Sequence, residues 1–155
     1  MWIPVIALCI VIVDQITKWI VVNNVDYGSS IPVINGFFNI TLVHNPGAAF
    51  GFFAHKQSLF IIFTFITIIV ISILSVKYAK NDLRLQLFLA LVLGGAIGNL
   101  IDRIRFQYVI DFIDVYVSRF HWPAFNIADS AICIGIGFLT YTLLKNNEQM
   151  DEKRS

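Results

Sequence analysis

Four apolar runs divide the chain, and each is long enough to cross a bilayer as a helix. They cover about residues 2–22, 57–76, 84–101 and 123–144, and a transmembrane helix needs about 20 mostly apolar residues. The second run contains no charged residue, so it is the clearest span. The pattern predicts a mainly α integral membrane protein whose residues 1–155 form a single domain.

The first run differs from a cleavable secretory signal. No basic residue precedes it, no small-residue cleavage site follows it, and it carries Asp14 and Lys18. A secretory signal has the opposite features, so we predict that the run is retained as a span.

The long connections, residues 23–56 and 102–122, alternate with a short one between the second and third spans. Residues 37–43 are β-branched and aromatic and follow Asn35-Gly36, a pattern typical of a strand after a turn. We therefore predict a small extracytoplasmic β-sheet on the membrane surface. Segment 104–122 is rich in aromatic residues and is predicted to be an outer-surface helical or loop element.

Composition supports a membrane protein and argues against nucleic-acid binding. Hydrophobic residues make up 57% of the chain and charged residues 14%, and the net charge is only +1. Basic residues at the termini and in the short connection outnumber the others six to five, and the bias grows if Lys18 and Arg103 are embedded in a site. The positive-inside rule then places both termini, including the polar tail 146–155, in the cytoplasm. We predict that this tail is frayed.

Polar residues of three spans gather in the same half of the bilayer. The residues of this group are Asp14, Lys18, Asn99, Asp102, Arg103, Asn126 and Asp129. A charged side chain at the centre of a spanning helix costs about 2.5–3.5 kcal/mol, so such residues are candidates for a functional site. The i,i+4 and i,i+3 spacings within each span place the members of the group on shared helix faces.

Structural roles remain open for several of these residues. Asp14 and Lys18 are four residues apart and can form a buried ion pair that only fixes the helix arrangement. Asp102 and Arg103 can be interfacial charges, or Arg103 can hold a carboxylate with two hydrogen bonds. Glycines 94, 95 and 98 favour close helix packing over direct contact with a substrate.

Asp129 lies within an apolar stretch and needs a partner for chemistry. Two adjacent carboxyl groups share a proton, so one can activate a water while the other protonates a carbonyl oxygen. We expect the pair to meet within hydrogen-bonding reach. Asp102, Asp111 and Asp114 are the candidates for the second acid, and spacing does not choose among them, although the apolar neighbours of Asp111 suit a desolvated acid.

Other chemistries have less support. The three histidines, His44, His55 and His121, all lie in connections, and no zinc-protease or Ser-His motif is present. A transport relay through the embedded acids and a lipid-binding chaperone are the rival classes. The confinement of polar groups to half of the bilayer argues against a relay, because a transport path must reach the other face.

Several motifs together resemble one known family. They are Asp14-x-x-x-Lys18, residues 45–50 (NPGAAF), 94–103 (GGAIGNLIDR), 109–114 (VIDFID) and 125–130 (FNIADS). Their order and sequence are similar to the signature blocks of bacterial lipoprotein signal peptidase, or signal peptidase II. The resemblance covers about residues 4–145, and Pro46 is its one departure from many members.

The resemblance implies an intramembrane aspartyl endopeptidase that cuts diacylglyceryl-modified prolipoproteins before the lipidated cysteine. It implies that Asp111 and Asp129 form the dyad and that supporting residues are Asp14, Lys18, Asn45, Asn99, Arg103, Asn126 and Ala128. We add Gly47, whose small size lets a peptide approach, and Asp102 from the polar group. Segment 104–122 would close over the site.

The same resemblance implies a location and a set of partners. The enzyme would lie in the bacterial cytoplasmic membrane with its active site toward the outer face. Its partners would be prolipoproteins, membrane lipids and globomycin-like inhibitors. We expect a monomer with no metal, no cofactor and no nucleic-acid partner.

Overall fold

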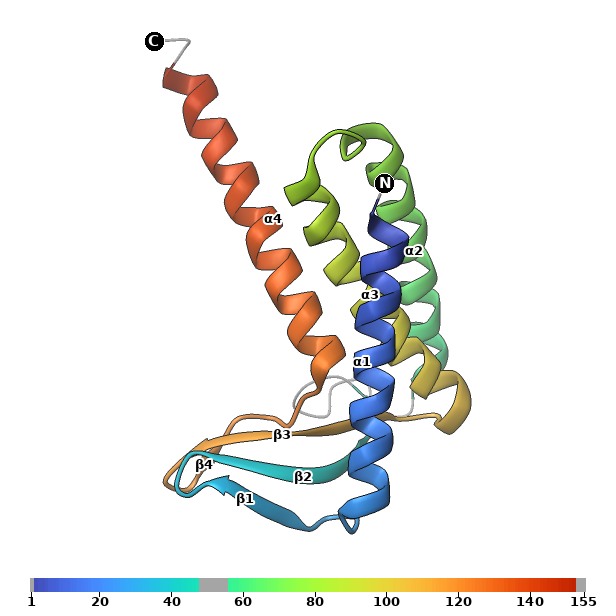
Figure 1. Ribbon diagram of the computed structural model, residues 1–155, viewed down its shortest axis with the longest axis vertical. Helices are drawn as coiled ribbons and strands as arrows, with labels where there is room; N and C mark the ends of the chain where they lie inside the picture. Colours follow the sequence, from blue (N-terminus) through green and yellow to red (C-terminus); the bar gives the residue numbers. More distant parts are fainter. Residues whose placement is uncertain (1, 48–55, 153–155) are drawn as a thin grey trace.

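The computed structural model describes residues 2–47 and 56–152, with side-chain surroundings through Lys145. Its helices are α1 (Ile3–Asn24), α2 (Gln57–Tyr78), α3 (Leu83–Phe106) and α4 (Ile127–Glu152) (Figure 1). All four are long and apolar enough to cross a membrane. The predicted architecture of four membrane helices with a small sheet is confirmed.

Helix α3 lies at the centre of the bundle. In its apolar span 61% of the residues are buried, compared with 11–22% in the other three. The outward faces of the other helices carry large apolar side chains such as Trp19, Phe63 and Val76, which are 67%, 62% and 72% exposed. Exposed apolar surface of this extent is suited to a lipid environment.

Glycines on α3 let its neighbours come into backbone contact. A Cβ atom at Gly95 would lie 2.3 Å from the carbonyl oxygen of Ala128 on α4. A Cβ atom at Gly98 would lie 2.7 Å from a carboxylate oxygen of Asp14 on α1. The structure therefore supports the packing role predicted for these glycines.

A four-stranded antiparallel sheet lies across one end of the bundle (Figure 1). Its strands, in spatial order, are β1 (Ser30–Ile34), β2 (Phe38–Asn45), β3 (Val109–Val117) and β4 (Phe120–His121). The strand predicted over residues 37–43 is β2. The prediction of a helical or loop element over 104–122 was wrong for most of that segment, because its β-branched residues pair with β2.

The sheet packs against the end of α1. Val21 and Val25 form a buried cluster with Leu42 of β2 and with Ile110 and Phe112 of β3. In Figure 1 the first turn of α1 and the last turn of α4 lie at the other end of the bundle, away from the sheet. The sheet therefore covers the helix ends that hold the polar residues.

Helix α4 begins and ends later than the predicted span. Residues 123–126 are not helical, because Phe125 forms a bridge with Ile113 of β3. Asp129 therefore lies in the first turn of α4. The tail that we expected to fray continues the helix to Glu152.

Candidate active site

Asn126 stands at the junction between the sheet and α4. Its side-chain oxygen accepts a hydrogen bond from the backbone N–H of Asp129 at 2.9 Å, which caps the start of the helix. Its amide nitrogen donates to the Asp111 carboxylate at 2.7 Å and to Asn99 at 3.2 Å. Asn126 is fully buried, so this one side chain fixes the relative positions of both candidate acids.

Asp111 lies on β3 and is only 2% exposed. One carboxylate oxygen accepts from Asn126 and the other accepts from Asn45 of β2 at 2.8 Å. Burial, followed by the nearby charge of Asp129, raises the pKa of Asp111 from 3.8 to about 7. Asp111 is therefore an acid that can hold a proton near neutral pH.

Asp129 is half-buried and reaches the same region from α4. Its carboxylate accepts a hydrogen bond from Asn99 of α3 at 2.7 Å, and its place in the first turn sets it in the positive end of the helix dipole. Among the described residues no hydrogen bond joins Asp129 directly to Asp111. The direct contact that we expected is replaced by the Asn126 bridge between them.

The other acids considered as partners are engaged elsewhere. Asp114 accepts from Asn39 at 2.9 Å and pairs with His121 at 2.7 Å. Asp102 is 1% exposed and binds Lys18 at 2.8 Å, so it is not an interfacial charge. The geometry thus brings Asp111, rather than these two, to the side of Asp129.

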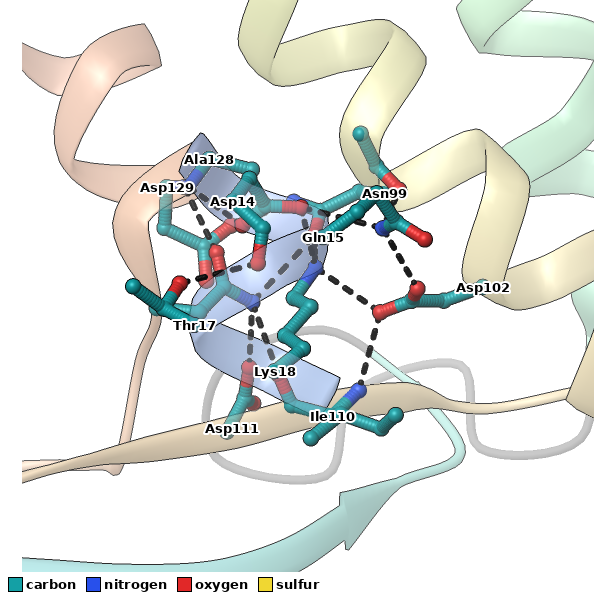
Figure 2. Close-up of polar contacts among 12 residues, drawn as sticks. Asp14, Gln15, Thr17, Lys18, Asn99, Asp102, Ile110, Asp111, Ala128 and Asp129 are labelled. Carbon is teal, nitrogen blue, oxygen red and sulfur yellow. Dashed lines mark hydrogen bonds and ion pairs between the residues drawn. The ribbon is translucent and has the colours of Figure 1, made fainter. Parts of the chain in front are cut away.

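Lys18 is the centre of a buried ionic cluster behind the two acids (Figure 2). Its ammonium nitrogen contacts Asp14 at 2.9 Å, Asp102 at 2.8 Å and the side-chain oxygen of Asn99 at 3.1 Å. These contacts use all three donors of the ammonium group. Because Asn99 then donates to Asp129, the cluster orients Asn99 with its amide nitrogen toward that acid.

Asp14 ties the first helix to the last. Its second carboxylate oxygen accepts from the backbone N–H of Ala128 at 2.9 Å. Ala128 is fully buried, and its Cβ fills the space that a side chain at Gly98 would need. A larger residue at position 98 or 128 would therefore push α4 away from α3. The predicted Asp14–Lys18 ion pair is present, and it also caps the helix that carries Asp129.

Asn45 and Gly47 form the edge of the site on β2. The backbone N–H of Gly47 donates to the side-chain oxygen of Asn45 at 3.0 Å. That contact directs the Asn45 amide nitrogen toward Asp111. The rest of the predicted 45–50 motif, from residue 48 on, lies outside the described residues.

Among the described residues, no carboxylate accepts a hydrogen bond from Arg103. Its guanidinium carbon lies 4.6 Å from the ring centroid of Phe60 on α2, a cation–π contact. Its Nε atom is buried without a hydrogen-bond partner among the described residues. Its positive charge is nevertheless close enough to interact with Asp102, Asp111 and Asp129.

Gln15 belongs to the cluster, although the sequence pattern did not single it out. Its amide nitrogen donates to Asp102 at 2.9 Å and to Asp14 and the Gly98 carbonyl at 3.2 Å. Its position in the sequence could have identified it, because it is a polar residue next to Asp14 within an apolar run.

The arrangement suits acid–base chemistry on a water. One acid is held between two amides with a raised pKa, and the other is half-buried at a helix N-terminus. Two acids in different surroundings can take the roles of proton donor and proton acceptor. The described residues contain no cluster of three or more His, Cys, Asp or Glu that could hold a metal.

Comparison with known proteins gives consistent results. The family described as "Signal peptidase (SPase) II" matches residues 6–145. A lipoprotein signal peptidase of Syntrophus aciditrophicus (strain SB) is 50% identical over 145 residues, covering 90% of both chains. Two solved structures, each described as a bacterial membrane enzyme, are 39% and 40% identical with TM-scores of 0.89 and 0.83. They cover 95% and 92% of this chain, and this chain covers 90% and 92% of theirs.

Proposed function

The chain belongs to the signal peptidase II family, and on this basis we propose that it is an aspartyl protease with Asp111 and Asp129 as its dyad. The family and its named relative support cleavage of lipoprotein signal peptides by a multi-pass membrane protein. Our proposal adds the mechanism, the lipidated substrate and the orientation. The Asn45–Asp111–Asn126–Asp129 arrangement is the observation that carries it.

In the proposed reaction, Asp129 is the general base and Asp111 the general acid. Asp129 takes a proton from a water, and the hydroxide attacks the carbonyl carbon of the scissile peptide bond. Asp111 gives its proton to the carbonyl oxygen, which produces a neutral tetrahedral intermediate. On collapse the C–N bond breaks, the leaving amine takes the proton from Asp129, and Asp111 recovers its own.

The assignment of roles follows from the surroundings of each acid. The raised pKa of Asp111, about 7, lets it keep a proton near neutral pH. The helix N-terminus and the Asn99 donor stabilise negative charge on Asp129. The Asn126 bridge keeps both acids on one side of the ionic cluster, where a water and a peptide carbonyl can lie between them.

The proposed substrate is a prolipoprotein that already carries diacylglycerol on its cysteine. Its acyl chains remain in the bilayer, so they deliver the bond before that cysteine at the depth of the dyad. The apolar outer faces of the helices and the position of the site beneath the sheet support this delivery. Globomycin-like peptides would compete for the same place.

We also propose that both termini are cytoplasmic and that the sheet faces outward. The end of the bundle away from the sheet carries Lys77, Lys80, Arg84 and Lys145. The positive-inside rule places such an end in the cytoplasm.

The test is a gel-shift cleavage assay with a diacylglyceryl-modified precursor. Asp111→Asn and Asp129→Asn should each reduce cleavage at least about a thousandfold, because each removes one proton-transfer group. Asp114→Asn is the matched control on the same strand and should keep cleavage. Cleavage at the wild-type rate in either dyad variant would remove that residue from the mechanism.

A further inference from the structure

A cavity lies beside the ionic cluster. Its volume is about 400 Å³, within the usual range for small-ligand sites. It lies between the last turns of α1 and α3 and the facing part of the sheet, and its lining includes Lys18, Asp102 and Ile110. Neither Asp111 nor Asp129 lines it.

Two residues of opposite charge line this cavity and have no role in the proposed reaction. Asp26 follows α1 and Arg105 is in the last turn of α3, and both are exposed and line the cavity. Neither side chain forms a hydrogen bond or an ion pair within the described part of the chain. Among the described residues, the Arg105 guanidinium contacts the ring of Phe106, at 4.9 Å from its centroid. The cavity thus offers one free cation and one free anion to a ligand.

The wall of the cavity on the sheet side is a row of aromatic rings. The ring centroid of His44 lies 4.0 Å from that of Tyr108, on which it stacks, and 4.5 Å from that of Tyr27. The ring centroids of Tyr108 and Phe106 are 5.8 Å apart. Burial lowers the pKa of His44, so its ring is neutral near pH 7. A neutral aromatic wall attracts a small cation rather than repelling it.

The rim of the cavity is apolar and faces outward. Trp19 and Val22, on the last turns of α1, are 67% and 44% exposed and line the cavity. An aromatic side chain at a helix end is typical of the boundary between the bilayer and water. A ligand with a polar head in the cavity can therefore extend acyl chains along α1 into the membrane.

From these features we propose that the cavity binds the headgroup of a membrane phospholipid bearing a primary ammonium, of the phosphatidylethanolamine type. Its phosphate binds Arg105, because a guanidinium donates paired hydrogen bonds to phosphate oxygens. Its ammonium binds Asp26 and lies against the Tyr27 face. A choline headgroup lacks the N–H donors that Asp26 needs, and a glycerol headgroup lacks the positive charge. The proposal is independent of the dyad mechanism.

The test measures lipid binding to the purified full-length protein in detergent by native mass spectrometry. The probes are phosphatidylethanolamine and phosphatidylglycerol with identical acyl chains. The wild type should bind the ethanolamine lipid roughly three- to tenfold more tightly, the scale of one charge-assisted contact. Soluble phosphoethanolamine at the same concentration should not displace it, since it has no acyl chains to anchor it.

Variants separate the two charges. Arg105→Gln should weaken both lipids roughly three- to tenfold, and Asp26→Asn should weaken only the ethanolamine lipid. Arg84→Gln, an exposed arginine at the other end of α3, is the matched control and should bind as the wild type. Both test residues are exposed, so their thermal unfolding should not change. Equal wild-type binding of the two lipids would overturn the proposal, as would unchanged binding in either test variant.

Discussion

Replacing Asp111 with asparagine should inactivate the protein and make it more stable at pH 8. The carboxyl group is 2% exposed, and its pKa is about 7 instead of 3.8. One pKa unit corresponds to about 1.4 kcal/mol, so holding the ionised group in the folded protein costs about 4 kcal/mol.

The sign of the effect depends on pH. The unfolded chain releases this proton near pH 4, whereas the folded protein keeps it until about pH 7. The folded state therefore binds more protons between these values, and the free energy of unfolding falls as the pH rises through that window. An asparagine is neutral throughout, so it removes this loss of stability.

The substitution also has a cost that is independent of pH. The carboxylate accepts from both Asn45 and Asn126, whereas an amide has only one acceptor oxygen. The lost hydrogen bond costs about 1–3 kcal/mol. The variant should therefore be about 1–3 kcal/mol more stable than the wild type at pH 8. At pH 5 the raised pKa costs the wild type only about 1.6 kcal/mol, so the two proteins should be about equally stable there.

Thermal unfolding in one detergent at pH 5, 6, 7 and 8 measures how the stability difference between the variant and the wild type changes with pH. For a chain of this size 1 kcal/mol shifts the midpoint by about 2–4 °C, so we expect a rise of about 2–10 °C at pH 8. Asp114→Asn on the same strand is the control and should lower the midpoint at both ends of the pH range, because the amide keeps only one of the two oxygens that contact Asn39 and His121. The reasoning would be refuted if the unfolding midpoint of Asp111→Asn were below that of the wild type by the same amount at pH 5 and at pH 8.

Three further perturbations test the supporting structure. Lys18→Met should lower the free energy of unfolding by about 3–5 kcal/mol, because it leaves Asp14 and Asp102 buried without a counter-charge. An unfolding midpoint equal to that of the wild type would contradict this. Gly95→Ala should lower the free energy of unfolding by about 1–3 kcal/mol and slow cleavage, because the added Cβ would meet the Ala128 carbonyl. Gly137→Ala, whose added Cβ meets no atom, is the control and should change neither. Equal effects of the two substitutions would disprove the close-contact argument. Chelators should leave cleavage unchanged, and activity lost in EDTA and restored by zinc would point to a metalloprotease.

Local patterns in the sequence were enough to predict the helices and part of the site. Apolar runs gave the four spans, and the i,i+4 spacing placed Asp14 with Lys18 on one helix face. Helical contacts of this kind depend only on residues a few positions apart. They can therefore be predicted without knowledge of the rest of the fold.

The partner of Asp129 could not be predicted from spacing because it depends on contacts between distant segments. Asp111 is placed by the pairing of β3 with β2, in which it lies opposite Val43. Asp114 is three residues away on the same strand and binds His121 instead. Only the strand register and the bridge to Phe125 decide which acid meets α4.

The hydrogen bond from Ala128 to Asp14 has a consequence for biogenesis. Asp14 is on α1, which leaves the ribosome before α4, so its acceptor oxygen has no Ala128 donor until α4 is made. Asp129 arrives with that same helix. Under the proposed dyad mechanism, a nascent chain therefore cannot hydrolyse peptides at any intermediate length and gains that activity only when α4 has been inserted.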